Sequence, residues 1–122
     1  MSKLESGGRT PTILVVEDDA LLRLAVADFL RDAGYTVIEA RSAAEAMSSF
    51  EQSNEVDLVF SDVQMPGDAD GLDLARWLGA HHPDVPVLLT SGVYLSAEEG
   101  VIPKPYDLAD VEALIGRLLP GP

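Results

Sequence analysis

Short apolar runs alternate with amphipathic stretches along this chain, and that alternation constrains its fold more than any other feature. The runs are rich in β-branched residues and cover 12–16, 35–40, 56–62, 85–92 and 101–103. A short apolar run of this kind predicts a strand that is buried on both faces. Strict alternation of such strands with helices predicts an α/β fold with a doubly wound, mainly parallel sheet and right-handed crossovers.

Four stretches between and after the strands place apolar residues three or four positions apart, as amphipathic helices do. The first begins after Asp19 and ends at Gly34, a residue type that suits a helix C-terminus. The second begins at Ser42 and has Glu45 three residues later, which is the spacing of a capping box. The apolar face predicted for the first helix is Leu22, Ala25, Val26, Phe29, Leu30 and Ala33. The other helices are predicted over 42–53, 71–82 and 107–119.

The interval between the last two strands is too short for an ordinary helix. Residues 91–100 allow a turn or two at about 3.6 residues per turn. We therefore expect a helix there that is short, irregular or absent. Residues 1–11 are expected to form a flexible leader, and 12–119 a single domain.

The chain is strongly acidic. It carries 21 Asp and Glu residues against 8 Lys and Arg residues, which gives a formal net charge of −13. These few basic residues cannot build a face that attracts nucleic acid or an anionic membrane, so neither is an expected partner. The charge instead suits a divalent cation or a basic surface on a protein partner.

Cysteine is absent from the chain, which excludes disulfides, thiolate metal sites and a cysteine nucleophile. This composition fits a reducing compartment, and we expect a cytoplasmic location. No apolar run approaches the ~20 residues of a membrane span, and the polar N-terminus lacks the apolar core of a signal peptide.

Acidic and polar residues follow the carboxyl ends of the predicted strands. In an open α/β sheet, the binding crevice lies at that edge. Three acids stand after the first strand, one acid ends the third, two hydroxyl residues end the fourth, and a lysine between prolines follows the fifth. These residues are Glu17, Asp18, Asp19, Asp62, Thr90, Ser91 and Lys104.

A shared cation would make this group of carboxylates tolerable. Neighbouring strands lie about 5 Å apart, so Asp18 and Asp62 can share an ion if their strands are adjacent. Carboxylate oxygens completed by water suit Mg²⁺. A carboxylate beside Mg²⁺ and Lys104 can attack phosphorus, with the metal and the lysine stabilising the phosphoryl oxygens. No general base is needed, because the carboxylate is already ionised.

Four motifs, in this order, resemble the receiver domain of two-component response regulators: "VVEDD", "SDVQMPG...DG", "TSG" and "PKPY". The resemblance covers roughly residues 11–119 and implies a receiver domain over 12–119. It also implies a flavodoxin-like, five-stranded parallel sheet in the order 2-1-3-4-5, with a shortened or irregular fourth helix. A cis peptide bond between Lys104 and Pro105 is implied as well.

The resemblance gives each motif residue an expected role. Asp62 is the expected phosphoacceptor, Thr90 the switch hydroxyl, and Lys104 the partner of the phosphoryl group. The expected Mg²⁺ ligands are Glu17 (largely through water), Asp18, Asp62 and the backbone carbonyl of Gln64. The expected phosphate-binding residues are Val63, Thr90, Ser91 and Lys104.

Three departures from the family pattern bear on switching. Val101 occupies the position of the usual aromatic switch residue, so coupling of that ring to Thr90 cannot operate in its usual form. The segment after Thr90 is short, and the loop 65–71 is one residue longer than the commonest form. The stretch "TSGVY" together with the short segment resembles a divergent, often stand-alone branch of receivers, and Tyr94 is a candidate partial replacement for the missing ring.

The predicted function is that of a single-domain response regulator. A sensor histidine kinase or a histidine phosphotransfer protein would donate a phosphoryl group to Asp62 in the presence of Mg²⁺. The domain would be a signalling switch that catalyses its own phosphorylation and dephosphorylation. Its output would be contact with a downstream protein target.

Other interpretations stay open. The chain is alternatively a degenerate receiver that binds partners without phosphorylation, or a fragment of a larger regulator. A Mg²⁺-dependent aspartyl phosphatase would place a second acid where Gln64 stands, and a flavin site would need a phosphate-binding loop after the first strand. Asp19 alone can be a helix cap, and His81 with His82 can be a favourable pair at a helix C-terminus.

Overall fold

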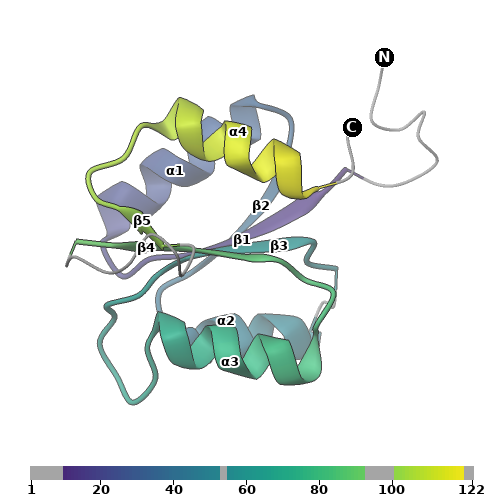
Figure 1. Cartoon of the computed structure of the whole chain (residues 1–122), viewed down its shortest axis with the longest axis vertical. Helices are drawn as coiled ribbons and strands as arrows, with labels where there is room; N and C mark the ends of the chain where they lie inside the picture. The colour runs from purple at the N-terminus through teal and green to yellow at the C-terminus, as the bar shows by residue number, and fades with distance from the viewer. Residues whose placement is uncertain (1–9, 53–54, 93–100, 120–122) are drawn as a thin grey trace.

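The structure is a computed structural model that describes residues 10–52, 55–92 and 101–119. Within these ranges, strands form one parallel sheet in the order β2-β1-β3-β4-β5 (Figure 1). They are β1 (Thr12–Val16), β2 (Thr36–Ala40), β3 (Leu58–Asp62), β4 (Val87–Ser91) and β5 (Val101–Pro103). This is the flavodoxin-like order that the sequence predicted, although β2, β3 and β4 begin one or two residues later than expected.

Helices cover both faces of the sheet (Figure 1). Those of the described ranges are α1 (Ala20–Asp32) and α4 (Leu108–Leu118) on one face, and α2 (Ala43–Gln52) and α3 (Gly71–His81) on the other. Alternate side chains of β1 enter opposite layers. Ile13 and Val15 join the apolar cluster under α1 and α4, whereas Leu14 and Val16 join the cluster under α2 and α3. The central strand β1 is thus buried on both faces, as its apolar sequence predicted.

The ends of α1 use the residues that the sequence indicated. Oδ1 of Asp19 accepts hydrogen bonds from the amides of Leu21, at 3.0 Å, and Leu22, at 3.2 Å. Gly34 follows the C-cap with a φ of 106°, a left-handed conformation that favours glycine. The helix-cap role of Asp19 is therefore confirmed, and it leaves Glu17 and Asp18 to be explained.

A modified capping box begins α2. Oγ of Ser42 accepts the amide of Glu45 at 3.1 Å, as predicted. The carboxylate of Glu45 accepts the amide of Arg41 at 2.7 Å instead of the amide of Ser42. Both bonds satisfy donors that the start of the helix would otherwise leave exposed.

The buried face of α1 is rotated relative to the predicted one. Val26, Ala27 and Leu30 are buried, whereas Ala25 is exposed. Leu21 on the outer face is 82% exposed. The spacing of apolar residues correctly indicates a helix, but the sheet and α4 decide which side of it is covered.

Some expectations concern residues outside the described ranges. The leader lies mostly in 1–9, and the helix predicted between β4 and β5, with Tyr94, lies in 93–100. These features and the single domain over 12–119 stay predictions. Each helix in the described part of the chain falls short of the length and apolar character that a membrane span requires.

Candidate functional site

The register of the sheet places the carboxyl ends of four strands at one edge. Asp62, the last residue of β3, pairs with Thr90 of β4. Ser91 of β4 pairs with Pro103 of β5, and Lys104 follows directly. β1 runs beside β3 and ends one residue before Glu17. The acids, hydroxyl groups and lysine indicated by the sequence therefore meet at the same edge.

Carboxylates gather at this edge. One carboxylate oxygen from each of Glu17, Asp18 and Asp62 lies within 4.8 Å of the other two. Glu17 and Asp62 are only 4% and 5% exposed, whereas Asp18 faces solvent. Asp18 and Asp62 thus lie as close together as a shared cation requires. Hard carboxylate oxygens in such a group suit a divalent ion such as Mg²⁺.

The ammonium group of Lys104 lies between the two buried acids. Its Nζ donates to Oε1 of Glu17 at 3.0 Å and to Oδ2 of Asp62 at 3.1 Å. Burial alone would lower the pKa of Lys104, but its hydrogen bonds to the two carboxylates and their charges outweigh burial and raise that pKa. Lys104 therefore stays protonated and offsets part of the negative charge.

Burial raises the pKa of Glu17 above its ordinary value. The amide of Asp19, which donates to Oε2 of Glu17 at 3.1 Å, opposes this rise, and so does Lys104. The charge of Asp62 adds to it. The carboxylate of Glu17 is thus buried beside a second acid, and an arriving cation would relieve that repulsion.

Asp62 keeps one oxygen without a partner. Its Oδ2 accepts from Lys104, whereas its Oδ1 is buried and has no hydrogen-bond partner among the described residues. An unsatisfied buried acceptor costs about 1–3 kcal/mol, so such a group at a polar edge indicates that something binds there. A cation would supply the missing partner, and the donor set therefore fits Mg²⁺.

Backbone and side-chain bonds tie the ends of β3 and β4 together. The amide of Val63, a predicted phosphate-binding group, donates to the carbonyl of Thr90 at 2.8 Å and is already engaged. Oγ of Ser91 donates to Oε1 of Gln64 at 2.8 Å. The carbonyl of Ser91 accepts the amide of Lys104 at 2.8 Å. The predicted roles of these residues in phosphate or metal binding stay predictions.

Val101 belongs to a small aliphatic cluster. It is buried and packs with Val63 and Leu89, and Leu89 is also its register partner on β4. The position of the usual aromatic switch residue is thus filled by a short apolar side chain. A switching role for Val101 stays a prediction.

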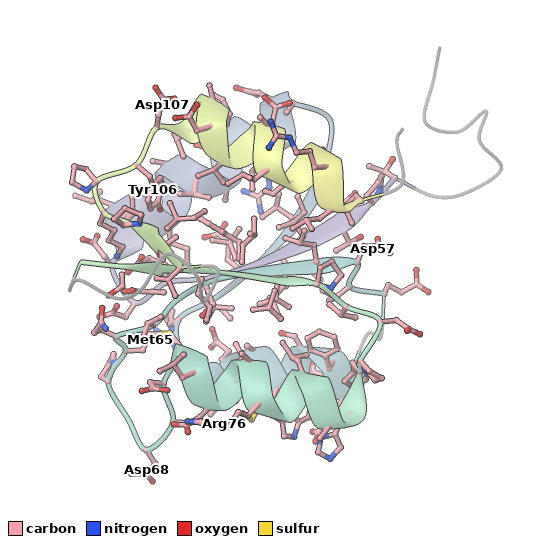
Figure 2. All side chains as sticks on the ribbon, in the orientation of Figure 1. Asp57, Met65, Asp68, Arg76, Tyr106 and Asp107 are labelled. Carbon is pink, nitrogen blue, oxygen red and sulfur yellow. The ribbon has the colours of Figure 1, made fainter. Side chains whose placement is uncertain are left out.

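Tyr106, the last residue of the "PKPY" motif, is a neighbour of the site to which the sequence analysis gave no role. Its ring meets Phe60 edge to face, with the ring centroids 5.7 Å apart, beside the loop between β5 and α4 (Figure 2). Burial raises the pKa of Tyr106 to about 12; the charge of Lys104 opposes the rise, and those of Glu17 and Asp62 add to it. An aromatic residue two positions after the motif lysine was the available signal.

Gly71 supports the backbone of Asp62. Its amide donates to the carbonyl of Val63 at 2.9 Å. A Cβ atom at this position would collide with the carbonyl oxygen of Asp62. The start of α3 therefore approaches the expected acceptor so closely that only glycine fits. The motif contains this glycine, but its spacing gives no sign of the contact.

Two smaller predictions concern a peptide bond beside the site and the C-terminal end of α3. The peptide bond between Lys104 and Pro105 is cis, as the family resemblance implied. His81 and His82 end α3, and Nδ1 of His81 lies 2.9 Å from the carbonyl of Trp77. The histidines thus lie at the C-terminal end of α3, whereas Asp62 lies beside its N-terminal end.

Along most of its length the chain is similar to proteins of bacterial signalling. Residues 13–115 match the family described as "Response regulator receiver domain". The chain is 36% identical over 118 residues to the sensor kinase CckA of Brucella abortus, a match that covers 88% of this chain and 12% of CckA. It is 37% identical over 120 residues to the DNA-binding transcriptional regulator NtrC of Rhizobium meliloti, covering 91% of this chain and 24% of NtrC. The chain thus spans a small part of these relatives.

The fold is similar to that of solved proteins of the same kind. The response regulator protein TrrA from Thermotoga maritima, solved in complex with Mg²⁺–BeF, superposes with a TM-score of 0.80. The two sequences are 26% identical, and the match covers 90% of this chain and 100% of TrrA. The match therefore includes most of this chain and the whole of TrrA.

Proposed function

The chain belongs to the response regulator receiver family, and we propose that its phosphoryl acceptor is the carboxylate of Asp62. Receiver domains are signalling switches that histidine kinases or phosphotransfer proteins phosphorylate. The proposal rests on the burial of Asp62 and on the contacts of its two carboxylate oxygens. This buried carboxylate has one oxygen bonded to Lys104 and another without a partner in the described part of the chain.

In the proposed reaction, an ionised oxygen of Asp62 attacks the phosphorus of a phosphohistidine on the donor protein. An O–P bond forms while the P–N bond breaks, and the electron pair of that bond leaves with the imidazole nitrogen. Asp62 has no proton to lose, so the step needs no general base. The product is an acyl phosphate on Asp62.

The charged residues of the site act on the phosphoryl oxygens. Mg²⁺ bound by Glu17, Asp18 and Asp62 would offset the negative charge of the transferred group. The ammonium of Lys104 already lies 3.1 Å from Oδ2 of Asp62, so it can pair with the phosphoryl group after a small movement. Thr90, the register partner of Asp62, supplies a hydroxyl at the same edge.

Phosphorylation would add about two negative charges at Asp62. Lys104 and Thr90 would then be drawn toward the phosphoryl oxygens, and Lys104 would give up part of its contact with Glu17. Because β5 and α4 flank Lys104, the surface that they form is the part of the fold whose affinity for a downstream protein target would change.

A degenerate receiver, which binds partners without phosphorylation, is the second candidate. Val101 favours it, because an aliphatic side chain cannot act as the usual aromatic switch residue. The stand-alone state, the absence of nucleic acid as a partner and a cytoplasmic location remain predictions.

Intact-mass spectrometry distinguishes the two candidates. Wild type and Asp62→Asn are incubated with Mg²⁺ and acetyl phosphate, with and without a chelator. We expect a single phosphoryl adduct on wild type, lost with the chelator and in Asp62→Asn. Asp68→Asn changes an exposed acid of the loop before α3 and is the matched control, which keeps the adduct. A wild type that gains no adduct from acetyl phosphate or from a phosphorylated phosphotransfer protein contradicts the proposal.

A further inference from the structure

Glu17 is anchored through its backbone as well as its side chain. Its amide donates to the carbonyl of Ala40, at the end of β2, at 3.0 Å. Its carbonyl accepts a hydrogen bond from Nη1 of Arg23 at 2.8 Å. Its carboxylate accepts the amide of Asp19 at 3.1 Å. The turn that carries Asp18 is therefore held at several points.

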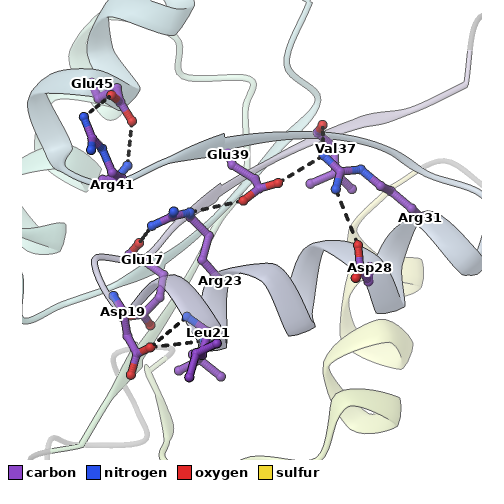
Figure 3. Close-up of polar contacts among 11 residues, drawn as sticks. Glu17, Asp19, Leu21, Arg23, Asp28, Arg31, Val37, Glu39, Arg41 and Glu45 are labelled. Carbon is purple, nitrogen blue, oxygen red and sulfur yellow. Dashed lines mark hydrogen bonds and ion pairs between the residues drawn. The ribbon is translucent and has the colours of Figure 1, made fainter.

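Arg23 is itself held by an acid on a neighbouring strand. Its Nε lies 3.1 Å from Oε1 of Glu39, and its side chain is only 15% exposed (Figure 3). The other carboxylate oxygen of Glu39 lies 3.3 Å from Nη2 of Arg31, about two turns further along the same face of α1. The guanidinium of Arg23 thus joins α1 and β2 to the carbonyl that follows β1.

The charge of Arg23 does not explain this arrangement. A cation close to a divalent metal site weakens metal binding, because like charges repel. A guanidinium, in contrast, directs its N–H groups in a rigid planar fork and can hold two acceptors in a fixed relation. In this protein the two acceptors are the carboxylate of Glu39 and the carbonyl of Glu17.

We propose that Arg23, oriented by Glu39, is a positioning residue of the metal site. It holds the turn after β1 so that the carboxylates of Glu17 and Asp18 face Asp62. This inference rests on the proposed Mg²⁺ site and extends it to residues that do not touch the ion. Residues that orient metal ligands typically change metal affinity by about 10- to 100-fold when they are replaced.

Calorimetric titration with Mg²⁺ separates positioning from charge. Arg23→Met removes both. Arg31→Met is the matched control, because Arg31 pairs with the same Glu39 while its other contacts are with Val37 and Asp28. We expect Arg23→Met to weaken Mg²⁺ binding by about tenfold or more. Arg31→Met should bind as tightly as wild type or more tightly. Binding by Arg23→Met that equals or exceeds that of wild type would overturn the inference.

Two conservative variants exclude a simple loss of folding. Glu39→Gln keeps the size of the side chain and removes the charge that orients Arg23. Arg23→Lys keeps the positive charge and removes the fork. We expect both to weaken Mg²⁺ binding while their thermal unfolding midpoints stay near that of Arg31→Met. Wild-type affinity in both variants would count against positioning.

Hydrogen exchange of the Asp19 amide gives a readout that does not depend on the metal. This amide donates to Oε2 of Glu17, so a looser turn exposes it to solvent. In metal-free protein we expect faster exchange in Arg23→Met than in Arg31→Met. A wild type that fails to bind Mg²⁺ refutes the proposed metal site, whereas equal exchange in the two variants refutes the positioning role.

Discussion

Lys104 and Asp62 lie within hydrogen-bond distance, with 3.1 Å between Nζ and Oδ2. The two residues come from different strands, because Lys104 follows β5 and Asp62 ends β3. The same ammonium also bonds Glu17, so it is the counter-ion of two buried acids. In the proposed switch Lys104 has two successive partners, first the pair of acids and then the phosphoryl group on Asp62.

Replacing Lys104 with methionine should separate metal binding from phosphoryl transfer. Mg²⁺ affinity is expected to stay the same or rise, because a repelling charge has gone. The rate of phosphorylation at saturating Mg²⁺ should fall by about 100-fold, since the phosphoryl oxygens lose a donor. Quenched intact-mass time courses measure the rate, and calorimetry measures the affinity. Lys104→Arg is the control and should retain part of the rate; weaker Mg²⁺ binding with an unchanged rate would contradict the assignment.

Mg²⁺ should raise the free energy of unfolding through the clustered carboxylates. At a concentration of 100 times its dissociation constant, a ligand that binds only the folded state adds about 2.7 kcal/mol. Because Asp18 is exposed, Asp18→Asn should leave the metal-free stability close to that of wild type and remove most of this increment. Urea denaturation with and without Mg²⁺ measures both quantities. An increment that survives in Asp18→Asn would show that Mg²⁺ acts elsewhere.

Gly71→Ala should destabilise the fold, because the added Cβ collides with the carbonyl oxygen of Asp62. Overpacking of this kind costs about 1–3 kcal/mol. Gly79→Ala, on the same helix, is the matched control: a Cβ there would meet no atom of the described residues within 4 Å beyond the local backbone of α3. Since alanine favours helix over glycine by about 0.5–1 kcal/mol, Gly79→Ala should stabilise the protein. Urea denaturation measures the free energy of unfolding of both variants. Equal changes in the two variants would argue against a close approach at Gly71.

Tyr106 should make stability sensitive to alkaline pH. Its pKa is raised by burial to about 12 from an ordinary value of 10.0, so the unfolded chain loses the phenolic proton first. The stability that the neutral phenol contributes is present below pH 10.0 and is lost as the pH rises toward 12. Lys104 and Tyr35, whose pKa values are also raised, act with the same sign. Tyr106→Phe should therefore make the decline in unfolding free energy over this range shallower. An unchanged slope would contradict the raised pKa of this half-buried phenol.

The features that the sequence predicted rest on local or periodic signals. Apolar runs and helical spacing locate the elements, and a parallel sheet then brings the carboxyl ends of its strands to one edge. Asp18, Asp62 and Lys104 could be assigned to the same site for this reason. The cap at Asp19 was likewise visible, because a cap needs only its own helix.

The features that the sequence did not reveal depend on how separate elements approach one another. Burial of Ala27 in place of Ala25 follows from the rotation of α1 against the sheet. The bond from Arg23 to the backbone of Glu17 requires α1 and the end of β1 to meet beside Glu39 of β2. The need for glycine at Gly71 appears only when α3 is set against β3.

Identifying the residue that carries the phosphoryl group tests the central claim most directly. Borohydride reduces an acyl phosphate on aspartate to homoserine, which marks the modified residue in a peptide map. After phosphorylation by a histidine phosphotransfer protein in the presence of Mg²⁺, we predict homoserine at Asp62 and at no other aspartate. Homoserine at Asp18 or at another acid, or an adduct that yields none, would contradict the claim that Asp62 is the acceptor.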